Sequence, residues 1–430
     1  MDIRDSNRDQ RRGSFDKRAT ACRLIFVGTL AAMLYHFVLM RLPAISAGYP
    51  YNTFLFDPVD RFSDFNDLFR PLVHGIHPYR DSVYFPGGYV ILNSFLPLRG
   101  YALAAFLFIS LTSTSILVPC LLKNRSIRER LCLLAAVLVS YPMLFGIDRA
   151  NLELLLLPLV LLWWTLRFKG YHIAAAMCLG LAGSAKLYPL LLLLPDLISF
   201  RIRRLALTTG FVILFTLLGL MMMPGTMVDS LQMLAGNLSY FKTAYVHEGA
   251  GWYNSVSALS MAKTINFVIG ALTGTDHRPL NRFMALNWNL VVVAGLAAML
   301  WGGWKLRRQH EWKSIMVATA AMVLLPSVSA DYKLLHILLP FILFLNAAPE
   351  INDRKIAVVF ALLLIPKSYL FLLYNLSIAV ILNPLLLIIL LPMALRAQEN
   401  RHYVPRRIEM KVRSAPVPDH AEVCVLQQYG

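Results

Sequence analysis

The chain has 430 residues, of which 57% are hydrophobic and 15% are charged, and its formal net charge is +17. Soluble domains carry about 25% charged residues, so this composition excludes an ordinary water-soluble enzyme. Mean hydropathy is +0.58. Apolar runs of about 20 residues, the length that crosses a bilayer core, recur from Ala21 to Leu395. The sequence therefore predicts one all-α, multi-pass membrane domain rather than two or three soluble ones.

The positive charge is concentrated in short clusters between the apolar runs. Lys and Arg accumulate in cytoplasmic loops of membrane proteins, so we attribute the charge to topology and expect no nucleic acid partner. The five cysteines are scattered, without the CxxC or CxxH spacing of a zinc site or a disulfide framework. We expect neither a metal nor a cofactor.

About twelve membrane helices are predicted in chain order, with both termini cytoplasmic. The ranges are 20–42, 99–121, 131–147, 151–167, 171–186, 188–200, 205–223, 287–304, 313–328, 334–346, 355–373 and 377–395. Basic clusters mark each return to the cytoplasm: 11–18, 123–128, 167–169, 201–204, 305–308, 354–355 and the tail from Arg396. The expected division is a cytoplasmic segment over 1–19, the membrane domain over 20–395 and a flexible cytoplasmic tail over 396–430.

Two long loops fall on the outer side, from Pro43 to about Gly88 and from Pro224 to about Leu286. Long ordered loops usually carry function. In the first loop, Asp64 and Asp67 are three residues apart and would share one face of a helical turn. Either carboxylate could act as a general base, accepting a proton from an attacking hydroxyl. The alternative is that both are loop caps or solvated charges.

Four cationic side chains are predicted on this same outer side: Arg149, Lys186, Lys333 and His336. Ionisable residues at membrane depth are costly and usually functional, and Arg and Lys are suited to binding phosphate. The four could form a phosphate site near the outer leaflet, although each alone could be an interfacial residue that extends its charge to water. Glu153 is either part of a buried network or faces a cavity.

The second outer loop carries Trp252, Tyr253 and Asn254. Aromatic rings pack on the apolar face of a sugar, and amides bind its hydroxyls. The competing explanation for a single Trp or Tyr is the aromatic belt at the membrane interface.

A series of short motifs in chain order resembles the GT-C superfamily of polyprenyl-phosphate-sugar-dependent glycosyltransferases, specifically glycosyltransferase family 87, the DUF2029 group. These motifs are Asp64-Phe65, Pro71, Gly75-Ile76-His77-Pro78-Tyr79, Tyr84-Phe85-Pro86, Gly146 to Asn151, Lys186-Leu187-Tyr188-Pro189, Asn254-Ser255, and Pro326-Ser327 with Tyr332. Two departures stand out. The Asp148-Arg149 pair replaces the Gln of a Gly-Gln-x-Asn turn, and the stretch between Pro71 and Gly75 is short. The short stretch leaves Asp64 and Asp67 both open as the catalytic carboxylate.

The resemblance implies a GT-C-type helical bundle in the bacterial inner membrane, moving a sugar on its outer face. The donor would be a polyprenyl-phosphate sugar, most often mannose in this family, and the acceptor a lipid or glycan. Asp64 or Asp67 would be the base of an inverting displacement, and Lys186, Arg149, Lys333 and His336 would bind the donor phosphate. Sugar and acceptor would contact Tyr79, Asn151, Trp252, Tyr253, Asn254 and Asp331. No nucleotide diphosphate is present to require a metal.

Three other functions fit a multi-helix membrane protein. A secondary transporter would use the same polar groups near the bilayer midplane. An O-antigen polymerase or ligase would use a lipid-diphosphate donor, and a structural or assembly role would need no site. The candidate residues lie in outer loops and at outer helix ends, which favours chemistry on a lipid-borne donor at the membrane surface.

Overall fold

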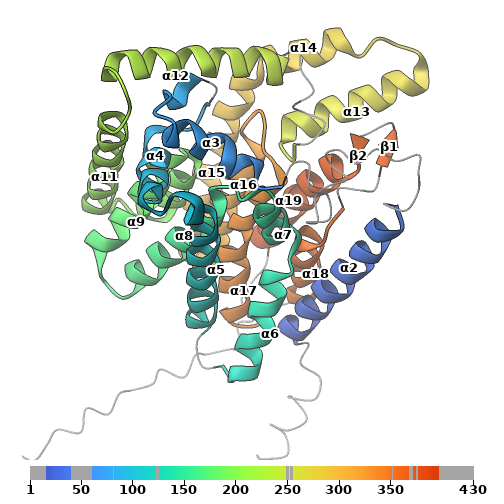
Figure 1. Cartoon of the computed structure of the whole chain (residues 1–430). Helices are drawn as coiled ribbons and strands as arrows, with labels where there is room; N and C mark the ends of the chain where they lie inside the picture. Colours follow the sequence, from blue (N-terminus) through green and yellow to red (C-terminus); the bar gives the residue numbers. More distant parts are fainter. Residues whose placement is uncertain are drawn as a thin grey trace, which may run out of the picture.

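A computed structural model describes residues 16–39, 61–80, 82–122, 125–247, 251, 255–350, 352–367, 371–373 and 376–396 (Figure 1). Most of the predicted segment 1–19, the start of the first outer loop and the tail after Arg396 lie outside the described residues. Within them the protein is helical, apart from one antiparallel pair of short strands, β1 (Phe371–Leu373) and β2 (Leu376–Ser377). The all-α membrane class is therefore confirmed.

The helical bundle in the body of the molecule contains both long and short helices (Figure 1). In chain order they are α2 (Lys17–Leu39), α5 (Ala102–Leu121), α6 (Ile127–Leu138), α7 (Tyr141–Arg149), α8 (Glu153–Phe168), α9 (His172–Ala185), α10 (Leu194–Ile198), α11 (Ile202–Met221), α15 (Trp288–Leu306), α16 (Glu311–Leu324), α17 (Leu338–Asn346), α18 (Asp353–Leu364) and α19 (Ala379–Arg396). Three 3₁₀ turns join them: η2 (Leu96–Tyr101), η3 (Tyr188–Leu193) and η6 (Asp331–Ile337).

Five helical segments in the described part are long and apolar enough to cross a membrane, and the bent pair α6–α7 would make a sixth. The five lie in α2, η2–α5, α11, α15 and α19. The predicted count of twelve spans is not confirmed. Several predicted helices are shorter or broken. The range 188–200 is a 3₁₀ turn followed by the short α10, because Pro189 and Pro195 fit only the first turn of a helix.

The helix α16 forms the centre of the core. Every residue from Trp312 to Leu324 is buried, and Trp312 packs edge-on against Phe344 of α17. A helix that is apolar on all sides is stable only when other helices surround it.

Lys17 and Arg18 of the first basic cluster lie at the start of α2, which is near α6 at the lower end of the molecule in Figure 1. Lys17 forms a 3.0 Å ion pair with Asp353, which joins the start of α2 to α18. Arg18 forms a 3.2 Å ion pair with Glu129 of α6. These two ion pairs connect the start of α2 to α18 and to α6, and the orientation of the chain in the membrane stays a prediction.

The described parts of both predicted outer loops fold largely into short helices at the opposite end. They are α3 (Ser63–Val73), η1 (Pro78–Arg80) and the start of α4 (Pro86–Asn93) in the first, and α12 (Met227–Phe241), η4 (Lys242–His247), α13 (Ala258–Thr273) and α14 (Arg278–Leu286) in the second. A capping box starts α12: the Thr226 hydroxyl accepts from the Asp229 amide, and the Asp229 carboxylate accepts from the Thr226 amide.

An amide side chain fastens the second outer segment to the first. Asn237 of α12 donates from Nδ2 to the carbonyl oxygens of Tyr79 and Ser82, at 2.6 and 2.9 Å. Both acceptors lie just before Tyr84 and the start of α4. The two outer segments therefore form one assembly above the helical bundle.

Close packing of α11 on the start of α4 gives a test of this arrangement. A Cβ at Gly219 would lie 2.1 Å from the Pro86 carbonyl oxygen, whereas a Cβ at Gly210 on the same helix would meet nothing within 4 Å. We expect Gly219→Ala to destabilise the protein by about 2–3 kcal/mol through overpacking against backbone. Gly210→Ala should be neutral or gain up to about 1 kcal/mol from helix propensity. Thermal unfolding of both variants in detergent checks this, and equal melting temperatures would contradict it.

Candidate active site

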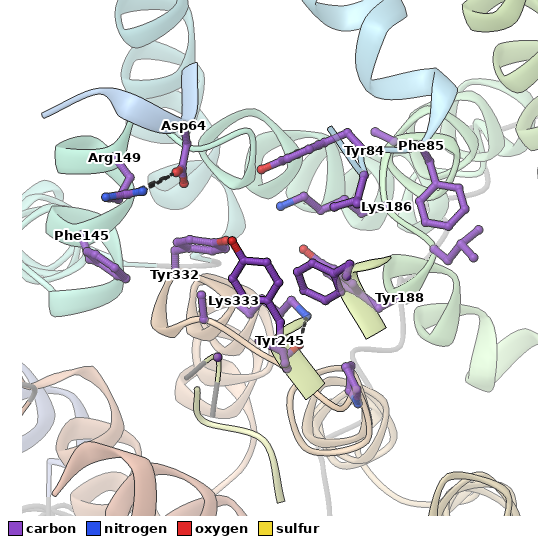
Figure 2. A pocket seen from close by; sticks show the side chains of 18 residues that line it. Asp64, Tyr84, Phe85, Phe145, Arg149, Lys186, Tyr188, Tyr245, Tyr332 and Lys333 are labelled. Atoms are coloured by element: carbon purple, nitrogen blue, oxygen red, sulfur yellow. Dashed lines mark hydrogen bonds and ion pairs between the residues drawn. The ribbon is translucent and has the colours of Figure 1, made fainter. Parts of the chain in front are cut away.

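A cavity of about 720 Å³ lies at the end of the bundle that carries α3 and η4, and Figure 2 shows the side chains that line it. Five separate stretches of the chain form its wall. They contribute Asp64, Val83, Tyr84 and Phe85; Phe145 and Arg149 of α7; Ala185, Lys186, Leu187 and Tyr188; Phe241, Tyr245 and Gly251; and Pro326, Val328, Ala330, Tyr332 and Lys333.

The carboxylate in this wall belongs to Asp64, in the first turn of α3. Arg149 donates to one of its oxygens from Nη2 at 2.8 Å and from Nε at 3.2 Å (Figure 2). Asn151 donates to the other oxygen from Nδ2 at 2.6 Å. The Asp64 side chain is 16% exposed and that of Arg149 is 21% exposed. The carboxylate is thus fixed in orientation but still borders the cavity.

The backbone on both sides of this ion pair is strained. Phe62 caps α3 with a φ of 60°, and Ala150 ends α7 with a φ of 46°. Positive φ is uncommon for residues other than glycine, and such strain tends to collect at functional sites. The Phe62 amide donates to the Asp148 carbonyl at 2.7 Å, which ties the two turns together and brings Asp64 to Arg149.

Lys186, immediately after α9, occupies the neighbouring part of the wall. Its ammonium donates to Glu153 at 2.7 Å and to the Asn151 side-chain oxygen at 3.2 Å. It also lies 4.9 Å from the ring centre of Tyr84 and 5.2 Å from that of Tyr332. Asn151 therefore connects Lys186 to Asp64 through a single amide.

Glu153 lies behind Lys186 and does not reach the cavity. Its side chain is 0% exposed, and its second oxygen is 2.7 Å from Nε2 of His336. Of the two interpretations of Glu153 from the sequence, the buried network is the one observed. A buried carboxylate paired with the Lys186 ammonium is stable only while that partner remains, because an unpaired buried charge is very costly.

Lys333 completes the cationic side of the cavity. Its ammonium donates to the Val328 carbonyl and the Ser329 hydroxyl, both at 3.2 Å, and lies 4.7 Å from the Tyr188 ring centre. Burial and the nearby charge of Lys186 lower the pKa of Lys333 to about 7. Three cations, from Arg149, Lys186 and Lys333, therefore border the same cavity as one carboxylate.

A comparison of the chain with models of protein families identifies the family to which it belongs. The model of glycosyltransferase family 87 matches residues 83–329, which is more than half of the chain. The chain belongs to glycosyltransferase family 87. The resemblance drawn from the short motifs is confirmed, and so is the prediction of a glycosyltransferase rather than a transporter. No curated protein matches the chain.

The match covers most of the cavity of this family 87 enzyme but not all of it. Tyr84, Arg149 and Lys186 lie inside the matched range, while Asp64 precedes it and Lys333 follows it. The structure brings all five into one wall. The segments outside the match therefore contribute to the same site as the segments inside it.

Some predicted site residues of the family 87 enzyme lie elsewhere. Asp67 is exposed on α3 and does not line the cavity. His336 contacts Glu153 and is buried, so only three of the four predicted cations border the cavity. The sequence does not indicate which way each of these side chains points.

Two of the residues predicted to contact the sugar or the acceptor are buried away from the cavity. Tyr79 is buried edge-on against Tyr89, at 5.5 Å between ring centres, and Asp331 is buried and accepts from the Tyr141 hydroxyl at 2.7 Å. Neither of the two lines the cavity. Asn151 belongs to the network that holds Asp64. Trp252, Tyr253 and Asn254 lie outside the described residues.

Much of the cavity wall is formed by aromatic side chains that are not among the predicted site residues. Figure 2 shows the rings of Tyr84, Tyr188, Tyr245 and Tyr332 around the cavity. Tyr84, Tyr188 and Tyr332 lie within motifs that carry the family resemblance, so these motifs could have indicated them as site residues. In the part of the chain that the structure describes, no group of three or more His, Cys, Asp or Glu side chains could hold a metal ion.

Proposed function

We propose that this family 87 enzyme transfers mannose from a polyprenyl-phosphate donor to a hydroxyl of a lipid or glycan acceptor. The reaction would take place on the outer face of the bacterial inner membrane, with both chain termini in the cytoplasm. The observation that carries the proposal is the arrangement of one carboxylate, Asp64, in the same cavity as Arg149, Lys186 and Lys333. A monoanionic carboxylate and a cluster of cations are the two elements that displacement of a lipid phosphate requires.

In the proposed reaction, Asp64 accepts the proton of the acceptor hydroxyl as that oxygen attacks the anomeric carbon of the sugar. The new bond from carbon to oxygen forms on the face opposite the phosphate. The bond from carbon to the phosphate oxygen breaks, and its electron pair leaves with polyprenyl phosphate. The anomeric configuration is inverted. Positioned proton acceptors contribute about 10²–10⁴-fold to such rates.

The leaving phosphate gains negative charge as the bond to the sugar breaks. Lys186 and Lys333 are the proposed stabilising groups, and Arg149 is a third cation within the same wall. Preorganised charges aimed at developing charge are the largest single contribution in many enzymes. The network through Asn151 and Glu153 fixes Lys186 before substrate arrives, so little reorganisation is needed during the reaction.

The aromatic rings of the wall are the proposed sugar-binding surface. Tyr188 and Tyr332 carry ring faces beside the ammonium groups of Lys333 and Lys186. A sugar stacked on either ring would hold its anomeric carbon near both the cations and Asp64. Orientation of this kind supplies a large part of the acceleration in transfer reactions.

The stereochemistry of the product tests the displacement mechanism. A donor of known anomeric configuration is supplied to the purified enzyme, and the new glycosidic linkage is assigned by NMR. Inversion is the expected result. Retention would exclude a single displacement with Asp64 as base, because retention needs an even number of displacements.

The pH dependence of transfer tests the role of Lys333. The pKa of Lys333 is lowered to about 7, so its positive charge is present below that pH and is lost as the pH rises through it. We expect kcat/KM for the donor to fall above about pH 7, since this ratio reports groups of the free enzyme. Lys333→Arg keeps its charge at all these pH values and should extend activity to higher pH. If kcat/KM falls at the same high pH in the variant and in the wild type, this role of Lys333 is contradicted.

A further inference from the structure

We propose that α12 and α14 lie in the headgroup layer of the bilayer, on the side of the active site, with their exposed apolar flanks in contact with lipid. This goes beyond the proposed reaction and does not depend on which sugar or acceptor the enzyme uses. The partner is the lipid surface itself. The proposal rests on burial patterns, on the attachment of both helices to membrane spans, and on unpaired charge.

The exposure pattern divides α12 into three faces. Ser230 and Leu234 are buried against the protein. The next flank exposes four apolar side chains, Met227, Val228, Leu231 and Leu238, with exposed fractions from 37% to 61%. At 3.6 residues per turn these four fall within a sector of roughly 100°. Beside them, Asp229, Gln232 and Ser239 form an exposed polar flank.

The shorter α14 has the same organisation and also carries positive charge. Asn281 and Ala285 are buried, and Leu280, Phe283 and Leu286 are 50%, 62% and 55% exposed. Arg278 and Arg282 are exposed on another flank, one turn apart. Among the described residues neither guanidinium has a hydrogen-bond or ion-pair partner. A helix with Leu and Phe on one flank and Arg on another is typical of the membrane interface.

Both helices are connected directly to candidate membrane spans. These connections place both helices near the ends of the spans, at the edge of the bilayer. α12 begins at Met227, just after the span α11 ends at Met221, and α14 ends at Leu286, just before the span α15 begins at Trp288. Figure 1 shows α12 and α14 lying across the upper end of the molecule, while α11 runs downward from that end. Helices that cross the ends of spans lie where the lipid headgroups are.

The lipid-facing surface also continues from the span into α14. Leu290, Val291 and Val293 of α15 are 70%, 46% and 66% exposed and follow Leu286 along the chain. The unpaired arginines on α14 then face a layer of lipid phosphates, which Arg binds well. Continuity with a spanning surface and complementary charge favour lipid over a protein partner for these flanks.

This placement has a consequence for the site. Phe241 ends α12, and it stacks on Tyr245 of η4 at 4.8 Å between ring centres; both side chains line the cavity. If α12 lies in the headgroup layer, this wall of the cavity lies there too. A donor whose phosphate is carried by a membrane lipid would then reach the site without leaving the bilayer.

The test uses single cysteines carrying an environment-sensitive fluorophore, in the full-length protein with its native cysteines replaced by alanine. Leu231→Cys and Phe283→Cys report the apolar flanks, and Gln232→Cys is the matched control on the polar flank of α12. The proteins are reconstituted in phosphatidylcholine vesicles and quenched by spin-labelled lipid or by aqueous iodide. Spin-labelled lipid should quench the labels at 231 and 283, and iodide should quench the label at 232.

Two results would overturn the proposal. Iodide quenching at 231 and 283 equal to that at 232 would place the flanks in water. Labels at 231 and 283 that are protected from both quenchers would show that another protein surface, such as a second copy of the chain, covers them. Both results are independent of whether the enzyme uses a polyprenyl-phosphate donor.

The arginines are tested by comparing quenching of the Phe283→Cys label by anionic and zwitterionic spin-labelled lipids at equal amounts. We expect the anionic lipid to be enriched near this label, by roughly fivefold per arginine at low salt. Arg278→Gln with Arg282→Gln should abolish the preference. The control is Arg203→Gln with Arg307→Gln, in the predicted cytoplasmic basic clusters, which should leave it unchanged. Equal quenching by both lipids in the protein with its native arginines would contradict the charge contribution.

Discussion

Replacing Asp64 with asparagine is expected to lower turnover by about 10²–10⁴-fold while leaving the fold and donor binding in place. Asparagine has the same shape and can still accept from Arg149 through its carbonyl oxygen, but it cannot take a proton from the acceptor hydroxyl. The measurement is the rate of label transfer at saturating donor, together with the binding of donor to the purified variant. A loss of rate with unchanged binding is the expected pattern.

Asp67 provides the matched control on the same helix. It is exposed one turn from Asp64 and does not line the cavity, so Asp67→Asn should transfer sugar at close to the normal rate. Normal turnover in Asp64→Asn together with loss in Asp67→Asn would move the base to Asp67. Normal turnover in both variants would show that neither carboxylate is the base.

Lys186→Gln is expected to lower kcat/KM for the donor by about 10²–10³-fold, because one cation facing the leaving phosphate is lost. The glutamine amide can still donate to Glu153, but the ion pair with that buried carboxylate is gone. Removing one partner of a buried pair costs about 3–5 kcal/mol of stability. Transfer kinetics and thermal unfolding of the same preparation measure both effects. Lys169→Gln, an exposed lysine of a predicted cytoplasmic cluster, should change neither quantity.

A double variant separates the catalytic effect of Lys186 from its structural one. Glu153→Gln with Lys186→Gln removes both charges of the buried pair, so no uncompensated carboxylate remains in the interior. We expect its melting temperature to recover toward the wild-type value while transfer stays slow. Recovery of both stability and transfer would mean that Lys186 acts only by balancing Glu153.

That the site residues lie together at one end of the helical bundle could be predicted from the sequence. Basic clusters alternate with apolar runs, so each run has a predicted cytoplasmic end, and this pattern predicts Asp64, Arg149, Lys186 and Lys333 together at the opposite end. The structure brings these four into one cavity wall. Which way a side chain points is decided by helix rotation and packing. This is why the buried contact of His336 with Glu153 could not be foreseen.

The number and shape of the helices were harder to predict for a related reason. Hydropathy detects apolar stretches but does not show where a helix breaks, as in the predicted range 188–200, which is a 3₁₀ turn followed by the short α10. Conversely, α12 and α14 alternate apolar and polar residues and fall below the hydropathy of a span. Hydropathy therefore predicts a loop over both helices, although capping and proline signals are present at Thr226 and Pro279.

Label transfer by the purified wild-type enzyme, with each class of donor supplied separately to an envelope lipid extract, tests the central claim most directly. Polyprenyl-phosphate mannose should label a lipid or glycan product, and a lipid-diphosphate sugar or a nucleotide sugar should not. Transfer from the polyprenyl-phosphate donor alone is the result that the charged cavity predicts. Transfer from a lipid-diphosphate or nucleotide sugar, with none from polyprenyl-phosphate sugars, would contradict it.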